Sequence, residues 1–323
     1  MLVPIETVAG PVEPDQLGAT LMHEHVGFLE PSGLYGCGEE TPDLAERALS
    51  CLPRHGIRTV VDLTGRGRAT TGADFDRLRA LSMSLSLNIV AGFSYYKEPW
   101  LVAAGTEDLD ELTAIYVGAA EAGGIGVYGE VGTSLDEITP REELHLRAAA
   151  RAHVRTGLAV STHCTLGTMA LEQVDILVEE GVDVSRMVIG HLDLRPDVAY
   201  LEQVLATGAN IAFDTFGKEW FDYRVPGSEG EKGVAFVKHG YHRPDDDRVE
   251  ALTALCAAGY ESQIVLSTDL SGLEAHLNPT THGRHGYGFL PAVILPRLRQ
   301  AGIDESSLTR MMVTNPVRIL TTP

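Results

Sequence analysis

The regular alternation of short apolar segments with longer helix-like segments is the feature that most limits how this 323-residue chain can fold. Strand-like segments rich in β-branched residues lie at 18–28, 58–65, 88–95, 126–134, 158–165, 187–194, 210–217 and 264–271. Helix-like segments lie at 42–55, 73–86, 107–122, 140–156, 168–180, 197–207, 245–258 and 291–300. This order predicts a parallel sheet covered by helices.

Glycines recur where each helix must stop and the chain must turn into the next strand, for example at positions 56, 157 and 259. A doubly wound sheet and a closed (β/α)8 TIM barrel both fit this pattern. Eight strands, with candidate functional residues from the first to the eighth, favour closure, because the carboxyl ends of barrel strands converge on one mouth. We therefore predict one catalytic α/β barrel domain spanning residues 1–323.

The charge balance argues against several kinds of partner. The chain has 45 acidic and 25 basic residues, a formal charge of −20, so we expect neither nucleic acid nor a membrane as a partner. No signal peptide and no run of about 18 apolar residues is evident. The four cysteines form no CxxC pair, which favours reduced thiols. We expect a cytoplasmic protein.

Two histidines two residues apart end the first strand-like segment. His23 and His25 would share one face of a strand and point into the barrel, while Glu24 would point outward to the helices. This pattern alone is weak, because histidine is also an ordinary polar core residue. His145 and His153 fall in a helix-like segment, and we expect them at the surface or an interface.

Four more strand-like segments end in a residue that can bind metal: Glu130, His163, His191 and Asp269. A buried carboxylate is costly unless it is paired or metal-bound, so repeated core packing is a poor explanation. Four imidazoles and two carboxylates can hold two divalent cations. Zinc is the first expectation, and manganese, cobalt and iron accept the same ligands.

The chain resembles the phosphotriesterase family of the amidohydrolase superfamily across almost its full length. The resemblance rests on these motifs: MHEHV (22–26), RHGIRTVVDLTGRG (54–67), NIVAGFSYYKEPW (88–100), GEVGTS (129–134), THCT (162–165), GHLD (190–193), GYESQIVLSTD (259–269) and MMVTNPVRIL (311–320). It implies that His23, His25 and Asp269 hold a buried metal and that His163 and His191 hold a more exposed one. Glu130 would bridge them, in place of the carbamylated lysine of phosphotriesterases proper, as in the phosphotriesterase homology branch.

This ligand set predicts metal-assisted hydrolysis. Two divalent ions that share a bridging water should lower its pKa toward neutrality and supply a hydroxide. Asp269 is the candidate catalytic residue that takes the proton and passes it to the leaving group.

The candidate substrate-binding residues lie in segments that follow the strands, where a barrel sets its specificity. Tyr95 or Tyr96 resembles a tyrosine that lines the site in lactonase-like relatives, although packing at the rim explains either one equally well. Lys218 and Arg284 belong to long segments, 218–244 and 272–290, that are rich in basic residues. These charges suggest an anionic or polar small-molecule substrate, unless they are merely solvated and balanced by nearby acids.

The predicted function is hydrolysis of a lactone or carboxylic ester, with phosphotriesterase activity as a side reaction. Thr215 stands where lactonase members often have a basic residue, which weakens a transfer of acyl-homoserine lactone specificity. An N-acyl amide substrate and a non-catalytic small-molecule-binding barrel are the alternatives. The resemblance further implies a homodimer.

Overall fold

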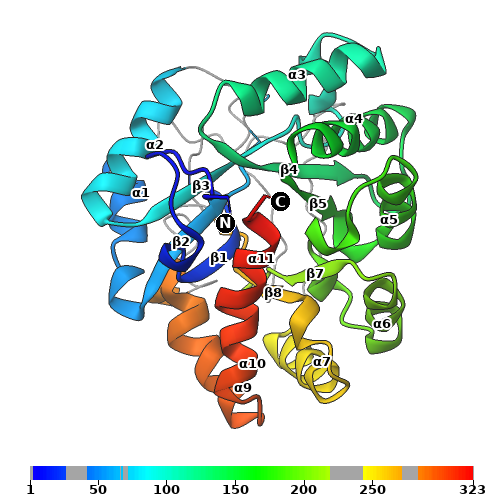
Figure 1. Ribbon diagram of the computed structural model, residues 1–323. Coiled ribbons are helices and arrows are strands. Elements are labelled where there is room, and N and C mark those ends of the chain that lie inside the picture. The colour runs from blue at the N-terminus through cyan, green and yellow to red at the C-terminus, as the bar shows by residue number, and fades with distance from the viewer. Residues whose placement is uncertain are drawn as a thin grey trace, which may run out of the picture.

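The computed structural model describes residues 3–26, 42–65, 67, 72–218, 243–270 and 283–322. Its centre is an eight-stranded parallel sheet in which neighbouring strands follow chain order (Figure 1). The strands are β1 (Ala19–Glu24), β2 (Ile57–Asp62), β3 (Asn88–Phe93), β4 (Ile125–Thr133), β5 (Ala159–Cys164), β6 (Met187–Ile189), β7 (Asn210–Phe213) and β8 (Ile264–Leu266). All eight expected strands are present, and each ends earlier than the sequence suggested.

Helices surround the sheet on its outer side (Figure 1). They are α1 (Pro42–Leu49), α2 (Gly72–Leu85), α3 (Leu109–Glu121), α4 (Pro140–Thr156), α5 (Ala170–Glu179), α6 (Val198–Ala206), α7 (Asp245–Ala257), α9 (Leu295–Gln300), α10 (Glu305–Thr309) and α11 (Asn315–Leu320). The helix expected at 291–300 begins as a π-helical turn, Leu290–Ile294, that leads into α9. The sequence analysis did not anticipate α10 and α11.

Hydrogen bonds just beyond the paired strands join β8 to β1 and nearly close the barrel. The amide of His25 donates to the carbonyl of Leu270 at 3.0 Å, and the amide of Asp269 donates to the carbonyl of His23 at 3.0 Å. The sheet is therefore a (β/α)8 TIM barrel, as the sequence predicted.

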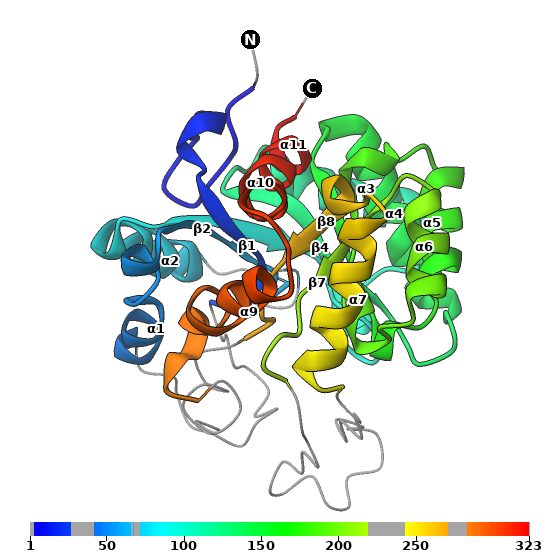
Figure 2. The same cartoon turned by 90° about the horizontal axis from the view of Figure 1, so that it is seen from below.

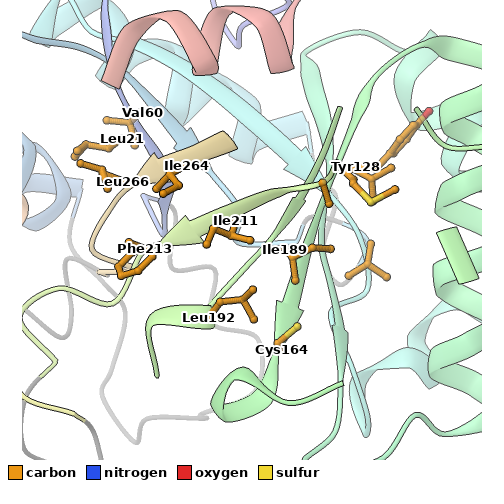
Figure 3. Close-up of a cluster of buried hydrophobic side chains, with 14 of the residues drawn as sticks. Leu21, Val60, Tyr128, Cys164, Ile189, Leu192, Ile211, Phe213, Ile264 and Leu266 are labelled. Carbon is orange, nitrogen blue, oxygen red and sulfur yellow. The ribbon is translucent and has the colours of Figure 1, made fainter. Parts of the chain in front are cut away.

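Alternate residues of the strands fill two separate apolar cores. One set, which includes Leu21, Val60, Ile211 and Cys164, packs between strands and helices (Figure 3). The strand residues that alternate with these fill the barrel interior, together with residues near the two ends of the chain. This second core consists of Ile5, Leu17, Met22, Val61, Leu63, Val90, Val127, Ala159, Val188, Ala212, Val265, Ile319 and Leu320. Cys164 thus points away from the interior, as expected for the residue after His163.

The two ends of the chain lie at the same end of the barrel (Figure 2). Ile5 and Leu17 near the start, with Ile319 and Leu320 near the finish, close the interior core there. The carboxyl ends of the strands form the opposite mouth, which places the candidate ligands together. Within the described ranges, no helix has the length and apolarity to cross a membrane.

The expectation for two helical histidines was wrong. His145 is fully buried, and its Nδ1 lies 3.2 Å from the hydroxyl of Tyr116. His153 is also buried, and its Nδ1 lies 2.7 Å from the carbonyl oxygen of Leu158. Both rings fill space between α4 and its neighbours, which a helix-wide polarity pattern does not show. The described cysteines, Cys51, Cys164 and Cys256, are free thiols, as expected.

Candidate metal centre

The strand pairing is irregular beside two of the predicted ligands, His23 and Glu130. The β1–β2 register shifts between Leu21 and Glu24, and the β4–β5 register shifts between Tyr128 and Val131. Tyr128 and Val131 both pack on the helix side, so the segment between them has one residue more than strict alternation allows. Glu130 consequently faces the interior.

Four imidazoles surround the carboxylate of Glu130. Its Oε2 lies 2.9 Å from Nδ1 of His163 and 3.4 Å from Nε2 of both His23 and His191, and its Oε1 lies 3.7 Å from Nε2 of His25. Glu130, His23 and His191 are almost completely buried. The described residues form three triads whose possible ligand atoms lie within 4.8 Å of one another: His23–His25–Glu130, Glu130–His163–His191 and His23–His191–Asp214. Glu130 is common to the first two, which is the position that the sequence analysis expected of a bridging ligand.

Asp269 completes the group from the side of β8. Its Oδ1 lies 2.8 Å from Nε2 of His25 and 3.6 Å from Nε2 of His23, and its Oδ2 accepts a hydrogen bond from the ammonium of Lys218. Burial by itself would raise the pKa of Asp269. The charges of Lys218, His191 and His25 outweigh burial and hold that pKa well below its usual range.

The carboxylates and imidazoles of the site shift one another's pKa. Burial would raise the pKa of Glu130, yet the neighbouring His163, His191 and His23 hold it well below its usual range. Burial lowers the pKa of His163 to about 3, whereas Asp214, Asp269 and Glu130 overcome burial and raise the pKa of His191 to about 9. Ionised carboxylates in a buried site are the electrostatic condition for binding a cation.

Asp214, which the sequence analysis did not identify as a site residue, lies behind two of these imidazoles. Its Oδ2 is 2.8 Å from Nδ1 of His23, and its Oδ1 is 3.0 Å from Nδ1 of His191. Asp214 is fully buried after β7, so it holds both rings with their Nε2 atoms toward Glu130. Its place at the end of the seventh strand, like the other ligands, is the signal that could have revealed it.

The residues present fit a pair of divalent cations. Nε2 of His23 is buried and has no hydrogen-bond partner among the described residues. Two ligand atoms bound at about 2.1 Å in a tetrahedral zinc site lie roughly 3.4 Å apart. The separations of 3.4 Å from Glu130 to His23 and to His191 match that spacing. Neutral imidazole nitrogens and carboxylate oxygens are also the ligand types that zinc, manganese, cobalt and iron accept.

Glu24 has a different environment from the one expected. Instead of facing the helices, its buried carboxylate accepts hydrogen bonds from the amide of Thr268 at 2.9 Å and the amide of Leu270 at 2.7 Å, as well as from the hydroxyls of Ser267 and Thr268. Glu24 therefore fastens the end of β1 to the segment that carries Asp269. Burial raises the pKa of Glu24 to about 7 despite these bonds.

The two candidate tyrosines point in opposite directions. The hydroxyl of Tyr96 lies 3.3 Å from Nε2 of His163, and the two rings meet edge to face with centroids 4.9 Å apart. Tyr95 packs behind the strand against Phe93, Tyr116 and His145. The structure thus brings Tyr96 to the ligands and leaves Tyr95 in the aromatic layer under the helices.

The other predicted substrate residues divide in a similar way. Lys218 is buried and pairs with Asp269, next to the ligands. The side chain of Arg284 lies outside the described part of the chain, and so do residues 219–242 and 272–282 of the two long segments. Thr215 does not face the ligands, because its amide and hydroxyl both donate to Oδ2 of Asp193 at 2.9 Å.

Three site residues have a left-handed backbone that residues other than glycine seldom adopt: φ is 74° at Tyr96, 62° at His191 and 47° at Asp269. Such conformations persist only where the surrounding structure enforces them, and they concentrate at functional sites. Here each one lies where the chain turns out of a strand, which supports a site at the mouth of the barrel.

Comparisons with known proteins identify the family of the chain. The sequence profile of the Phosphotriesterase family matches residues 3–320. The phosphotriesterase homology protein of Escherichia coli K12 is 30% identical over 312 residues, covering 94% of this chain and 97% of the relative. The N-acetyltaurine hydrolase of Dictyostelium discoideum is 29% identical over 378 residues, covering 98% and 97%.

Solved structures of phosphotriesterase-like proteins share the fold of this chain. The Escherichia coli phosphotriesterase homology protein, complexed with phosphate in its active site, superposes with a TM-score of 0.80 at 29% identity and covers 95% of this chain and 99% of its own. The organophosphorus hydrolase of Deinococcus radiodurans superposes with a TM-score of 0.79 at 30% identity, covering 99% of each chain. The protein belongs to the phosphotriesterase family.

Proposed function

We propose that this chain is a metal-dependent hydrolase that binds two divalent ions, zinc in the first instance, and cleaves the acyl bond of a small polar substrate. The observation that carries the proposal is the position of Glu130, whose carboxylate lies among four imidazoles. The hydrolase names borne by relatives along the whole chain support the same reaction class.

Each ion would have its own ligands. His23, His25 and Asp269 would hold one ion, His163 and His191 would hold the other, and Glu130 would bind both. When bound, the ions would polarise the carbonyl of the substrate and lower the pKa of an attacking water. Asp214 would keep the rings of His23 and His191 in their binding orientation.

Asp269 is the proposed general base. Its low pKa keeps the carboxylate ionised but also makes it a weak base, so it would accept the proton only of a water whose pKa the ions have lowered. Lys218 fixes Oδ2 of this carboxylate, and His25 lies beside Oδ1. Asp269 would then return the proton to the nitrogen or oxygen of the leaving group, which balances the hydrolysis.

We place N-acyl amides first among the substrates. Five relatives, 26–30% identical to this chain over nearly its whole length, are named N-acetyltaurine hydrolase. Lactones and carboxylic esters are the second candidate, which the position of Tyr96 beside His163 favours. The organophosphorus hydrolase similarity supports phosphotriesters as a side activity.

A hydrolysis panel followed by mass spectrometry tests this proposal. Zinc- or manganese-loaded protein is offered N-acyl amides, lactones, carboxylic esters and a phosphotriester, with Glu130→Ala as the control. We expect turnover of an N-acyl amide that is lost in Glu130→Ala. Absence of turnover for every class by the metal-loaded protein would instead favour the small-molecule-binding barrel.

A further inference from the structure

Lys97 is a basic residue at the mouth of the barrel that the proposed reaction does not yet use. It follows β3 and is partly exposed. Its ammonium donates to the hydroxyl of Thr165, and that hydroxyl lies 3.3 Å from Nε2 of His163. The ammonium is therefore two hydrogen-bond lengths from an imidazole assigned to the more exposed ion.

The backbone around Lys97 holds it at this place. The amide of Gly132 donates to the carbonyl of Tyr96 at 2.9 Å, and the amide of Tyr96 donates toward the hydroxyl of Ser94 at 3.1 Å. A Cβ at Gly132 would lie 3.1 Å from Cβ of Lys97 and 3.2 Å from Cβ of His163. Glycine at position 132 is thus what lets Lys97 approach His163 so closely.

Aromatic side chains border the same spot. The ammonium of Lys97 lies 5.6 Å from the ring centroid of Tyr96, whose ring is 5.3 Å from that of Trp100. The positive charge of Lys97 also acts on His163, where it helps to lower the pKa. A cation, two aromatic rings and a proposed metal ligand thus lie together, an environment suited to an anionic group.

We propose that Lys97 is a specificity-determining residue that binds a carboxylate or sulfonate of the substrate, next to the acyl bond to be cleaved. This inference rests on the proposed function and narrows its substrate class to anionic N-acyl compounds. In an N-acyl amino acid the carboxylate carbon lies roughly 3–4 Å from the acyl carbon, and its oxygens reach roughly 1 Å farther, because only the nitrogen and one carbon intervene. A carbonyl at the ions would place that group beside His163, where Lys97 lies.

A purely structural role for Lys97 makes a different prediction. If the residue only supported Thr165 and the loop, its replacement would change stability or weaken all ligands equally. If it binds an anion, replacement weakens charged ligands and leaves neutral ligands of the same shape unaffected. The ratio of the two affinities therefore separates the roles.

The experiment uses titration calorimetry with the metal-loaded protein and two ligands that cannot be hydrolysed. These are 4-oxopentanoate, in which a methylene replaces the amide nitrogen of N-acetylglycine, and its neutral counterpart 4-oxopentanamide. The variants are Lys97→Met, Lys97→Arg and, as the control, Arg141→Met. Arg141 pairs with Glu98, the neighbour of Lys97 in the chain. This control therefore removes a nearby positive charge and leaves the proposed metal ligands unchanged.

We expect the wild-type protein to prefer 4-oxopentanoate at least tenfold, Lys97→Met to abolish that preference, and Lys97→Arg and Arg141→Met to retain most of it. An equal preference in wild-type and Lys97→Met protein would overturn the inference. Hydrolysis of N-acetylglycine against N-acetylglycinamide gives the companion measurement, in which Lys97→Met should raise KM only for the charged substrate. Absence of hydrolysis with intact 4-oxopentanoate binding would count against the proposed function and leave the Lys97 assignment standing.

Discussion

Nδ1 of His23 and Nδ1 of His191 share one carboxylate, that of Asp214, at 2.8 and 3.0 Å. The carboxylate lies at the end of β7 and also accepts the backbone amide of His191 at 2.9 Å. In the proposed centre His23 and His191 bind different ions. Asp214 therefore couples the orientation of the two ion sites.

Replacement of Asp214 by asparagine should weaken binding of both ions. An amide cannot accept from two imidazole N–H groups as a carboxylate does, and loss of such a partner typically costs 10–100-fold in metal affinity. Competition with a chromogenic chelator measures this. Asp197→Asn, which changes a carboxylate that caps α6, is the charge-matched control. Unchanged affinity in Asp214→Asn would show that the two rings are held by packing alone.

Asp269→Asn should separate binding from turnover. The amide retains an oxygen toward the ions but cannot accept the proton of water. We expect most of the metal content to remain, with kcat reduced about 100-fold or more. Metal analysis and steady-state kinetics on the same preparation check both parts. A variant that hydrolyses the best substrate of the panel at the normal rate would remove Asp269 from its role as base.

Glu24→Gln should weaken the junction between the end of β1 and the segment that follows β8. The carboxylate of Glu24 accepts bonds from the Ser267–Leu270 segment, and an amide would direct N–H groups toward some of these donors. We expect the unfolding free energy to fall by about 1–3 kcal/mol, the scale for leaving a buried hydrogen-bonding group unsatisfied. Urea denaturation measures the loss, with the exposed Glu13→Gln as the control. Equal stability of the two variants would contradict a stabilising role of Glu24 at this junction.

His145 should make the protein less stable in acid. Burial, with a contribution from the charge of Arg141, lowers its pKa to about 4 in the folded state. An unfolded histidine titrates near 6.5, so between about pH 6.5 and 4 the unfolded chain binds a proton that the folded chain does not. Folding stability contributed by this group is thus present above pH 6.5 and is lost as the pH falls, by on the order of 2–3 kcal/mol.

The comparison of pH profiles isolates this contribution. His145→Gln keeps a polar group beside Tyr116 but cannot titrate, so its unfolding free energy should fall less steeply between pH 6.5 and 4 than that of the wild-type protein. Urea denaturation at several pH values gives both curves. Parallel curves would mean that other groups account for acid sensitivity in this range.

The barrel architecture, and the meeting of the candidate ligands at one mouth of the barrel, could be predicted from the sequence because both depend on local patterns. Apolar β-branched segments mark strands, glycines such as Gly157 mark helix ends, and polar residues at strand ends mark the mouth. The direction of Glu130 could not be predicted in the same way. It depends on the shift of register between Tyr128 and Val131, which no local pattern reveals.

Other features depend on contacts between distant segments. The place of Asp214 at a strand end marks it as a candidate, but its role in positioning His23 and His191 follows only from the meeting of the carboxyl ends of β1, β6 and β7 at the barrel mouth. Glu24 is explained only by its bonds to residues more than 240 positions later. The choice between Tyr95 and Tyr96 required knowledge of which face of β3 points inward. Phe93 on the helix side answers that question, because alternation then places Tyr95 with it and Tyr96 opposite.

Metal stoichiometry tests the central claim most directly. Protein purified without chelators is loaded with zinc, freed of excess metal and analysed by inductively coupled plasma mass spectrometry, with Glu130→Ala prepared in parallel. We expect about two equivalents of tightly held metal in the wild-type protein and a clear loss in Glu130→Ala, while circular dichroism shows both proteins to be folded. A folded wild-type protein that retains no metal, or a Glu130→Ala variant that still holds two equivalents, would contradict a binuclear centre built around Glu130.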